Sequence, residues 1–228
     1  MDRYNNDNNG HMEKNGELRL IQEVLPSASV VFDIGANIGD WTMSALKINS
    51  RAEYHCFEPN PATFRLLLAQ NFPSNAILNN LGIGEKVGSM ELYVSEGNSG
   101  NDSLYNRQTG NAFPASREIV RIDTLDAYCE RRGIRHIDFL KVDVEGHELS
   151  VLRSGKKLLE QGTIKMIQFE YGGTYIDAGI RLKDVWDFMQ ATNKNYALCK
   201  VHPGELRPIP AYHQSLENYQ YSNWVLMK

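Results

Sequence analysis

The stretch that decides the fold is Phe32-Asp33-Ile34-Gly35-Ala36-Asn37-Ile38-Gly39. It continues an apolar run that begins at Val30, and it leads into residues 41–48, which are typical of a helix. A strand that passes through a glycine turn into a helix opens a βαβ unit, and ligands of such sheets bind outside the carboxyl ends of the strands. Gly35 allows the backbone to approach a ligand closely, and Gly39 allows the helix to start next to the strand. The stretch therefore predicts an α/β fold with a binding site at this turn.

The spacing of the two glycines indicates the kind of ligand. Dinucleotide enzymes usually carry GxGxxG, which places a pyrophosphate at the start of the helix. Here the order is Asp33, one residue, Gly35, three residues and Gly39. The acid ahead of the turn would repel a pyrophosphate but suits a ligand with ammonium and sulfonium groups. The spacing favours S-adenosylmethionine, and a nicotinamide oxidoreductase is the less favoured alternative.

Carboxylates also stand at the predicted ends of two further strands. Residues 54–57 lead to Glu58, where a carboxylate can accept hydrogen bonds from both hydroxyls of a ribose. A stronger strand, predicted at residues 137–144, carries Asp143 near its end. Because the carboxyl ends of parallel strands meet at one edge of a sheet, Asp143 is expected beside Asp33 and Glu58, where the transferable methyl group would lie.

Methyl transfer to an alcohol needs a group that takes the hydroxyl proton, and a positioned base speeds such a step by about 10²–10⁴-fold. The candidates at the carboxyl edge are Asp143 and His147 first, and then Glu145 and Glu170. The alternative for His147 is that it is only a solvated residue at a helix start, with no role in the reaction. Asp143, Glu145 and Glu170 could also supply oxygen ligands to a divalent metal. The metal is not favoured, because acids at strand ends also serve the cofactor.

The rest of the chain alternates apolar strands with amphipathic helices, which is typical of a parallel sheet covered on both faces. Strands are predicted at residues 76–81, 90–94, 119–122, 164–170, 196–201 and 224–227, and helices at 61–71, 124–132, 149–160 and 182–192. Two segments with several aromatic residues, 95–117 and 202–221, are expected either to form lids over the acceptor or simply to cover the sheet ends.

The composition bounds the class of protein. With 228 residues and a net charge of −4, one domain is expected at residues 17–228, after a disordered Asn-rich tail at residues 1–16. The three cysteines fit no disulfide or zinc pattern, which indicates a reducing compartment and a cytoplasmic location. No membrane span is expected, and the mild acidity speaks against a nucleic-acid partner. The oligomeric state is not specified.

Together these motifs resemble the FkbM family of S-adenosylmethionine-dependent methyltransferases. The resemblance covers residues 30–170 and rests on the glycine turn, Phe57-Glu58-Pro59-Asn60-Pro61, Ser103-Leu104, Asp123-Thr124-Leu125-Asp126 and residues 140–148. It implies a Rossmann-like class I fold, a doubly wound, mostly parallel sheet of seven strands with one antiparallel edge strand. It also implies methyl transfer to a hydroxyl of a small-molecule or glycan acceptor, such as a sugar, a glycolipid or a polyketide-type natural product.

The resemblance further implies roles for single residues. Asp33, Gly35 and Asn37 would hold the methionine end of the cofactor, Glu58 the ribose, and Asn80 and Leu81 the adenine. The other expected cofactor contacts are Ala36, Gly39, Trp41, Pro59, Ser103 and Asp143. A non-catalytic binding module of the same fold is the alternative, although such a module would be expected to have lost acids or glycines that are present here.

Overall fold

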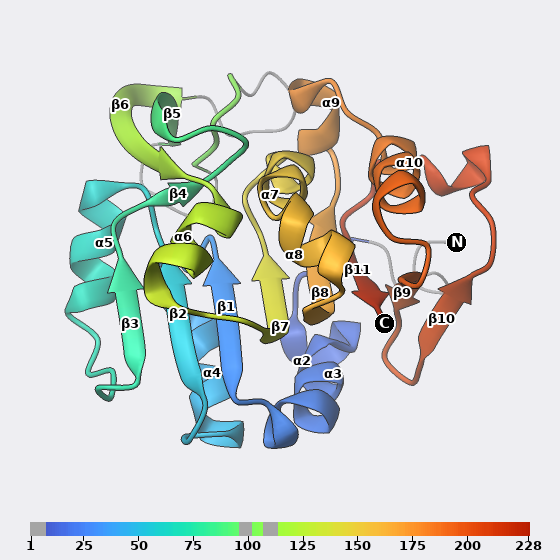
Figure 1. Ribbon diagram of the computed structural model, residues 1–228. Helices are drawn as coiled ribbons and strands as arrows, with labels where there is room; N and C mark the ends of the chain where they lie inside the picture. The colour runs from blue at the N-terminus through green and yellow to red at the C-terminus, as the bar shows by residue number, and fades with distance from the viewer. Residues whose placement is uncertain (1–7, 96–101, 107–113) are drawn as a thin grey trace.

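The computed structural model describes residues 8–95, 102–106 and 114–228, and an eight-stranded sheet forms its centre (Figure 1). In spatial order the strands are β10 (Leu206–Ile209), β9 (Ala197–Val201), β11 (Ser222–Met227), β8 (Ile164–Tyr171), β7 (Ile137–Val142), β1 (Val30–Ile34), β2 (Glu53–Phe57) and β3 (Ala76–Asn79). The five strands from β8 to β3 pair in parallel. The predicted fold class, an α/β fold with a mostly parallel sheet, is confirmed.

Two details of the sheet differ from the prediction of seven strands with an antiparallel strand at the edge. The antiparallel strand β11 lies inside the sheet, between β8 and β9, and an eighth strand, β10, forms the edge. β10 contains Pro208, which lacks a backbone N–H and is tolerated only on edge strands. A short strand with a proline has no clear sequence pattern, so the sequence did not reveal it.

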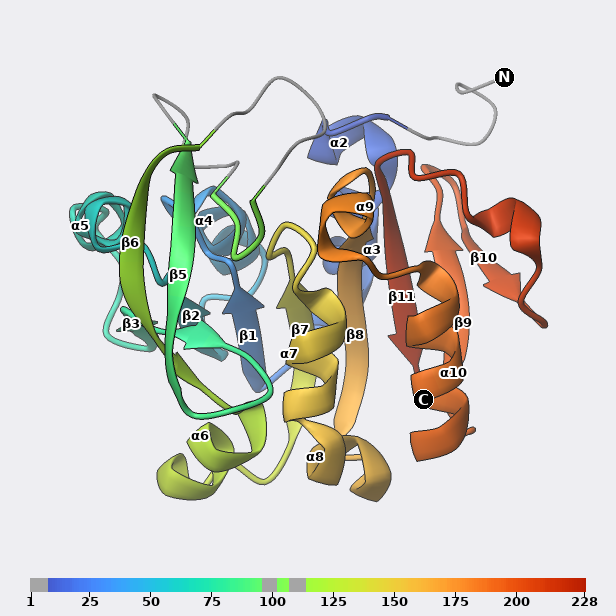
Figure 2. The ribbon, with the colours of Figure 1, turned by 90° about the horizontal axis from the view of Figure 1, so that it is seen from above.

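Helices cover both faces of the sheet, as Figure 2 shows from above. One apolar core joins α3 (Glu17–Val24), α4 (Asp40–Ile48) and α5 (Pro61–Leu68) to one face, and the other joins α6 (Leu125–Arg132), α7 (Glu148–Ser154), α8 (Lys156–Gln161) and α10 (Leu182–Thr192) to the opposite face. Neighbouring strand residues alternate between the two cores: Val31 packs in the first and Phe32 in the second. Burial on both faces explains why these strands are mostly apolar.

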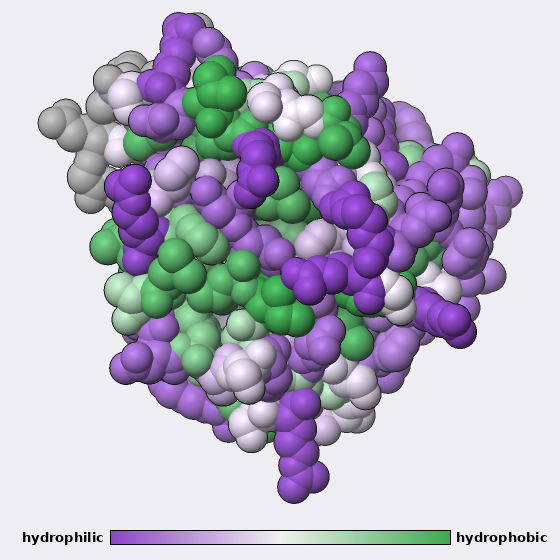
Figure 3. Space-filling model, turned by 60° about the vertical axis from the view of Figure 1, so that its left-hand side comes forward, coloured by the Kyte–Doolittle hydropathy of each residue, from purple (hydrophilic) through white to green (hydrophobic). Residues whose placement is uncertain are grey.

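A small second sheet stands beside the carboxyl ends of β1, β2 and β3 (Figure 1). It contains β4 (Gly82–Ile83), β6 (Pro114–Asp123) and β5 (Gly88–Ser95) in that spatial order. Exposed apolar side chains lie on β5 and β6, at Met90 and Ile119, and on α5, at Leu66 and Leu68. Figure 3 shows that apolar and hydrophilic groups are mixed on the side of the molecule it presents.

Several elements refine the expected boundaries. The helix predicted at residues 149–160 is broken at Gly155, where a Cβ atom would lie 2.7 Å from Leu125 Cδ2. The segment after β8 contains α9 (Thr174–Ala178), which the sequence analysis did not predict, and single 3₁₀ turns occupy Leu25–Ser27 and Gln214–Leu216. Parts of the expected lid at 95–117, residues 96–101 and 107–113, lie outside the described residues.

The tail predicted at residues 1–16 extends too far. Residues 1–7 lie outside the described residues, but Met12–Asn15 form the helix α2, and Asn15 is buried. The backbone of this segment is tied to the start of β11, because Asn8 N–H donates to the Tyr221 carbonyl at 2.8 Å. Tertiary contacts therefore order a segment whose polar composition predicts disorder.

Two further findings concern the chain as a whole. Cys56, Cys129 and Cys199 are all buried free thiols, as expected from their spacing. Within the described ranges, every helix is too short or too polar to cross a membrane.

Candidate functional site

Two pockets meet at the carboxyl ends of β1 and β7. The first, here called the Glu58 pocket, is lined by residues that include Gly35, Asn37, Glu58, Pro59, Leu81, Asp102, Leu104, Asp143, Glu145 and His147. The second, the Trp41 pocket, is lined by residues that include Met12, Glu13, Glu17, Ala36, Trp41, Lys141, Glu170 and Tyr221, and it shares Gly35, Asn37 and Asp143 with the first. Most of the predicted site residues are thus brought together.

The glycine turn lies directly against the end of β7. Gly35 has a φ of +86°, and a Cβ atom on it would stand 1.7 Å from the carbonyl oxygen of Asp143. Asp143 N–H donates in turn to the Ile34 carbonyl at 2.9 Å. Residue 35 must therefore be glycine, both for its left-handed conformation and for this close approach.

Glu58 sits at the floor of its pocket, with only 7% of its surface exposed. Its carboxylate accepts hydrogen bonds from the backbone N–H groups of Asn37, at 3.1 Å, and Asn60, at 2.8 Å. Burial raises the pKa of Glu58 to about 7, against the lowering effect of these donors. The carboxylate is thus held in one orientation and keeps acceptor sites for a ligand.

Asp33 lies beneath the pockets rather than in their walls. It is 1% exposed, and it accepts hydrogen bonds from Thr42 Oγ1 at 2.6 Å and from Lys141 Nζ at 3.4 Å. Lys141 also pairs with Asp143 at 3.0 Å. Although burial alone lowers the pKa of the Lys141 ammonium, Asp143 and Asp33 outweigh it and hold that pKa above its usual value. Asp33 is therefore positioned to act on the site through Lys141.

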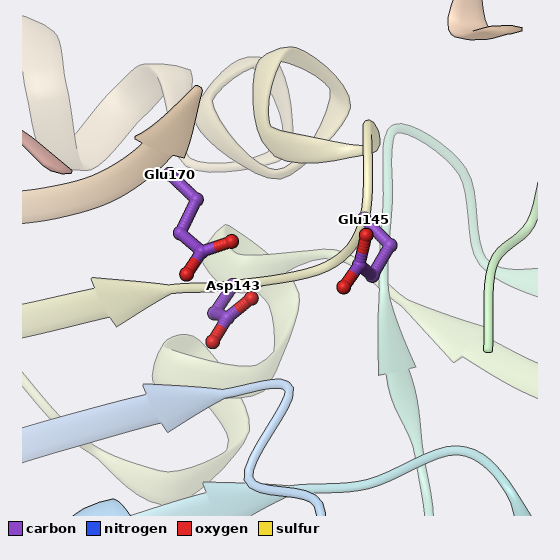
Figure 4. Close-up of side chains that lie close together, drawn as sticks. All are labelled: Asp143, Glu145 and Glu170. Atoms are coloured by element: carbon purple, nitrogen blue, oxygen red, sulfur yellow. The ribbon is translucent and has the colours of Figure 1, made fainter. Parts of the chain in front are cut away.

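Three carboxylates gather where β7 and β8 end, and Figure 4 shows Asp143 and Glu170 facing one another, with Glu145 on the loop beyond β7. One oxygen from each of Asp143, Glu145 and Glu170 lies within 4.8 Å of the others. Burial, followed by the charges of Asp143 and Glu145, raises the pKa of Glu170 well above its usual value. The cluster can accept a proton or coordinate a cation.

His147 does not belong to this cluster. It is 4% exposed, lines the Glu58 pocket, and its Nδ1 is 3.0 Å from the hydroxyl of Tyr105. Burial lowers the pKa of His147 to about 4, so the imidazole is neutral at pH 7. A group with so low a pKa is a weak base, and its position on the Glu58 side separates it from Glu170.

Besides Asp33, three predicted contacts do not line either pocket. Gly39 has a φ of +95° at the start of α4 and packs against Phe72. Asn80 donates from its side chain to the carbonyls of Glu58 and Pro59. Ser103 is buried and donates from its hydroxyl to the Glu145 carbonyl at 2.8 Å. Each supports a pocket residue or a neighbouring backbone.

Other lining residues were missed by sequence reasoning. Asp102 and Leu104 line the Glu58 pocket. They belong to residues 102–106, here called the strap. Glu17 reaches the Trp41 pocket from α3 and accepts a hydrogen bond from Gln168. The only sequence signal for the strap was the Ser103-Leu104 motif that it contains, and α3 carried no signal. Two residues of the segment 95–117 thus line the Glu58 pocket.

Comparison with known proteins gives consistent matches. Residues 33–198 match the model of the methyltransferase FkbM domain. Hexuronic acid methyltransferase AglP of Haloferax volcanii is 25% identical over 190 residues, which cover 82% of this chain and 72% of that protein. 2-O-methyltransferase NoeI of Sinorhizobium fredii is 26% identical over 175 residues, 70% of each chain.

A similar solved structure is the FkbM methyltransferase of Methylobacillus flagellatus, with a TM-score of 0.52 and 17% identity. The match covers 88% of this chain and 44% of that one. At this identity the likeness concerns the fold alone.

Proposed function

This chain belongs to the FkbM methyltransferase family, and from that premise we propose that it is an S-adenosylmethionine-dependent O-methyltransferase acting on a hydroxyl of a sugar, glycolipid or natural-product acceptor. The names of two relatives support this acceptor class, because one acts on a hexuronic acid and the other is a 2-O-methyltransferase. The observation that carries the proposal is the Glu58 pocket, with a buried carboxylate facing the glycine turn.

The residues present fit this cofactor. Glu58 offers acceptors to the ribose hydroxyls, and Leu81 offers an apolar surface to the adenine. The turn at Gly35 leaves space that a Cβ atom would fill, so the chain can lie close to the methionine end. When bound, the cofactor supplies a methyl group on a positively charged sulfur.

We place the general base in the acid cluster, at Asp143 or Glu170. A carboxyl whose pKa is raised towards neutral is a better base at pH 7 than one with an ordinary value, and burial acts in this direction on Glu170. Asp143 lines both pockets and so lies between the proposed cofactor and acceptor sites. Glu145 can assist from the same cluster, whereas the low pKa of His147 argues against a role as the general base.

The acceptor is proposed to occupy the Trp41 pocket. Its walls combine an indole ring with the carboxylates of Glu13, Glu17 and Glu170. An aromatic surface beside hydrogen-bond acceptors suits a hydroxyl-rich ring. A cytoplasmic location remains part of the proposal, since the three cysteines are free thiols.

A methyl-transfer assay tests the proposed function. The protein is incubated with S-adenosylmethionine labelled in its methyl group and with simple pyranosides and uronides, and labelled products are separated from the cofactor. Label in a base-stable ether product supports O-methylation, whereas label only in carboxylate-ester products, which base hydrolyses, would contradict it.

A further inference from the structure

Resting on the proposed function, we propose that Asp102 is a second carboxylate that binds the ribose of the cofactor, opposite Glu58. The two acids reach the same pocket from different elements, Glu58 from the end of β2 and Asp102 from the strap. Neither sequence motifs nor strand ends point to Asp102.

Asn60 links the two carboxylates. Its backbone N–H donates to Glu58 Oε1 at 2.8 Å, and its side-chain amide donates to Asp102 Oδ2 at 2.6 Å. Asn60 is 2% exposed and caps α5, because its side-chain oxygen accepts from Ala62 N–H at 2.8 Å. A residue fixed by a helix start thus sets the spacing of the two acids.

The remaining acceptor sites of these acids match a diol. Asp102 accepts from Asn60 and from Ser95 N–H, at 2.9 Å, and Glu58 accepts from two backbone N–H groups. An ionised carboxylate offers about four acceptor sites, so each acid can accept a further hydrogen bond from a hydroxyl. Two adjacent hydroxyls, as on a ribose, supply two such donors, whereas a phosphate would be repelled by both acids.

The strap is held on both sides of the pocket. Ser103 forms backbone hydrogen bonds with Tyr93 on β5, at 2.8 and 3.0 Å, and its hydroxyl donates to the Glu145 carbonyl. The Tyr105 hydroxyl contacts His147 Nδ1 at 3.0 Å. In Figure 2 the strap is the short green segment between the two grey traces, between β5 and the loop after β7. These contacts bring Asp102 to the pocket.

The test uses S-adenosylhomocysteine and its 2′-deoxy and 3′-deoxy analogues, titrated calorimetrically into four proteins. These are the wild type, Asp102→Asn, Tyr105→Phe and the control Asp126→Asn. Asp126, on α6, also accepts hydrogen bonds from two backbone N–H groups, at 3.0 Å from Lys157 and 3.2 Å from Leu158 at the start of α8, but it lines neither pocket. Circular dichroism confirms folding, and Asp102→Ser replaces Asp102→Asn if that variant does not fold.

Asp102→Asn is expected to weaken the S-adenosylhomocysteine complex about tenfold, the scale of one hydrogen bond to a charged group. For one of the two deoxy analogues, the factor by which Asp102→Asn weakens binding should be at least about threefold smaller than for S-adenosylhomocysteine, because that analogue lacks the hydroxyl that Asp102 binds. Tyr105→Phe should lower the affinity for all three ligands by one common factor. Asp126→Asn should leave all three affinities unchanged.

Two results would overturn the inference while the proposed function stands. One is a change under about threefold for S-adenosylhomocysteine in Asp102→Asn. The other is an equal loss for all three ligands, which would make Asp102 only an anchor of the strap. Failure of the wild type to bind S-adenosylhomocysteine would instead contradict the proposed function itself.

Discussion

The carbonyl oxygen of Asp143 occupies the place where residue 35 would carry a Cβ atom, 1.7 Å from its ideal position. This contact joins the turn after β1 to the end of β7, and both proposed binding regions depend on it. A side chain at residue 35 would push the two strand ends apart.

Gly35→Ala is therefore expected to lower the free energy of unfolding by about 2 kcal/mol or more and to abolish cofactor binding. Gly133→Ala is the matched control, because Gly133 also has a positive φ, +68°, but meets nothing within 4 Å. Urea denaturation should show a smaller loss for the control, about 1 kcal/mol, with binding retained. Equal losses in both variants would contradict the importance of the contact.

The pKa of Glu58, about 7, predicts a pH dependence of cofactor affinity. The ionised carboxylate is the stronger acceptor for hydroxyls, and its population rises as the pH passes through this pKa. Affinity for S-adenosylhomocysteine should therefore increase from pH 6 to pH 8, by up to about tenfold. Glu58→Gln should bind more weakly and lose the increase. A wild-type affinity that falls over this range would contradict the assignment.

Lys141→Met should destabilise the fold, because it leaves the buried carboxylate of Asp33 without its cationic partner. Removing one member of a buried pair costs about 3–5 kcal/mol. The double variant Lys141→Met/Asp33→Asn should recover part of this loss, since the buried side chain at residue 33 then carries no charge. Thermal and urea unfolding measure both effects, and a single variant as stable as the wild type would show that the pair is unimportant.

Methyl transfer is expected to survive chelation by EDTA. Asp143 is already paired with Lys141 at 3.0 Å, and the raised pKa of Glu170 lowers its negative charge, so the cluster gains little from a divalent cation. Activity lost in EDTA and restored by Mg²⁺ would instead establish a metal at Asp143, Glu145 and Glu170.

The acid cluster and His147 should respond differently to substitution. Asp143→Asn and Glu170→Gln are expected to keep the fold, and the one that removes the base should lower kcat by about 10²–10⁴-fold. His147→Gln should lower kcat less than about tenfold, because the neutral imidazole lies on the cofactor side. The reverse order of effects, measured with any acceptor that the labelling assay identifies, would return His147 to the role of base.

The parallel part of the fold could be predicted because its strands are buried on both faces and therefore read as apolar runs. Val30–Ile34 and Ile137–Val142 lie within one or two residues of their predicted bounds. The position of β10 could not be predicted, since it depends on pairing with β9 rather than on its own composition. Likewise, the segment that leads into α2 is bonded to a distant part of the chain, through the Asn8 N–H and the Tyr221 carbonyl.

The same distinction applies to the candidate site. The positions of Glu58 and Asp143 follow from strand ends, because the carboxyl ends of parallel strands must meet at one edge. Which side of that edge each residue faces depends on the turns that follow, so the sequence did not separate His147 from Glu170. Asp102 depends on a strap that reaches the pocket through hydrogen bonds to Asn60 and Glu145, and these have no local signal.

Calorimetric titration of the wild-type protein with S-adenosylhomocysteine tests whether the Glu58 pocket binds the cofactor. We expect binding at one site with a dissociation constant below about 100 μM, equivalent to roughly −5.5 kcal/mol, and much weaker binding to Glu58→Gln. The absence of heat from binding at millimolar ligand, with a folded protein, would contradict both the proposed methyltransferase function and the assignment of the Glu58 pocket to the cofactor.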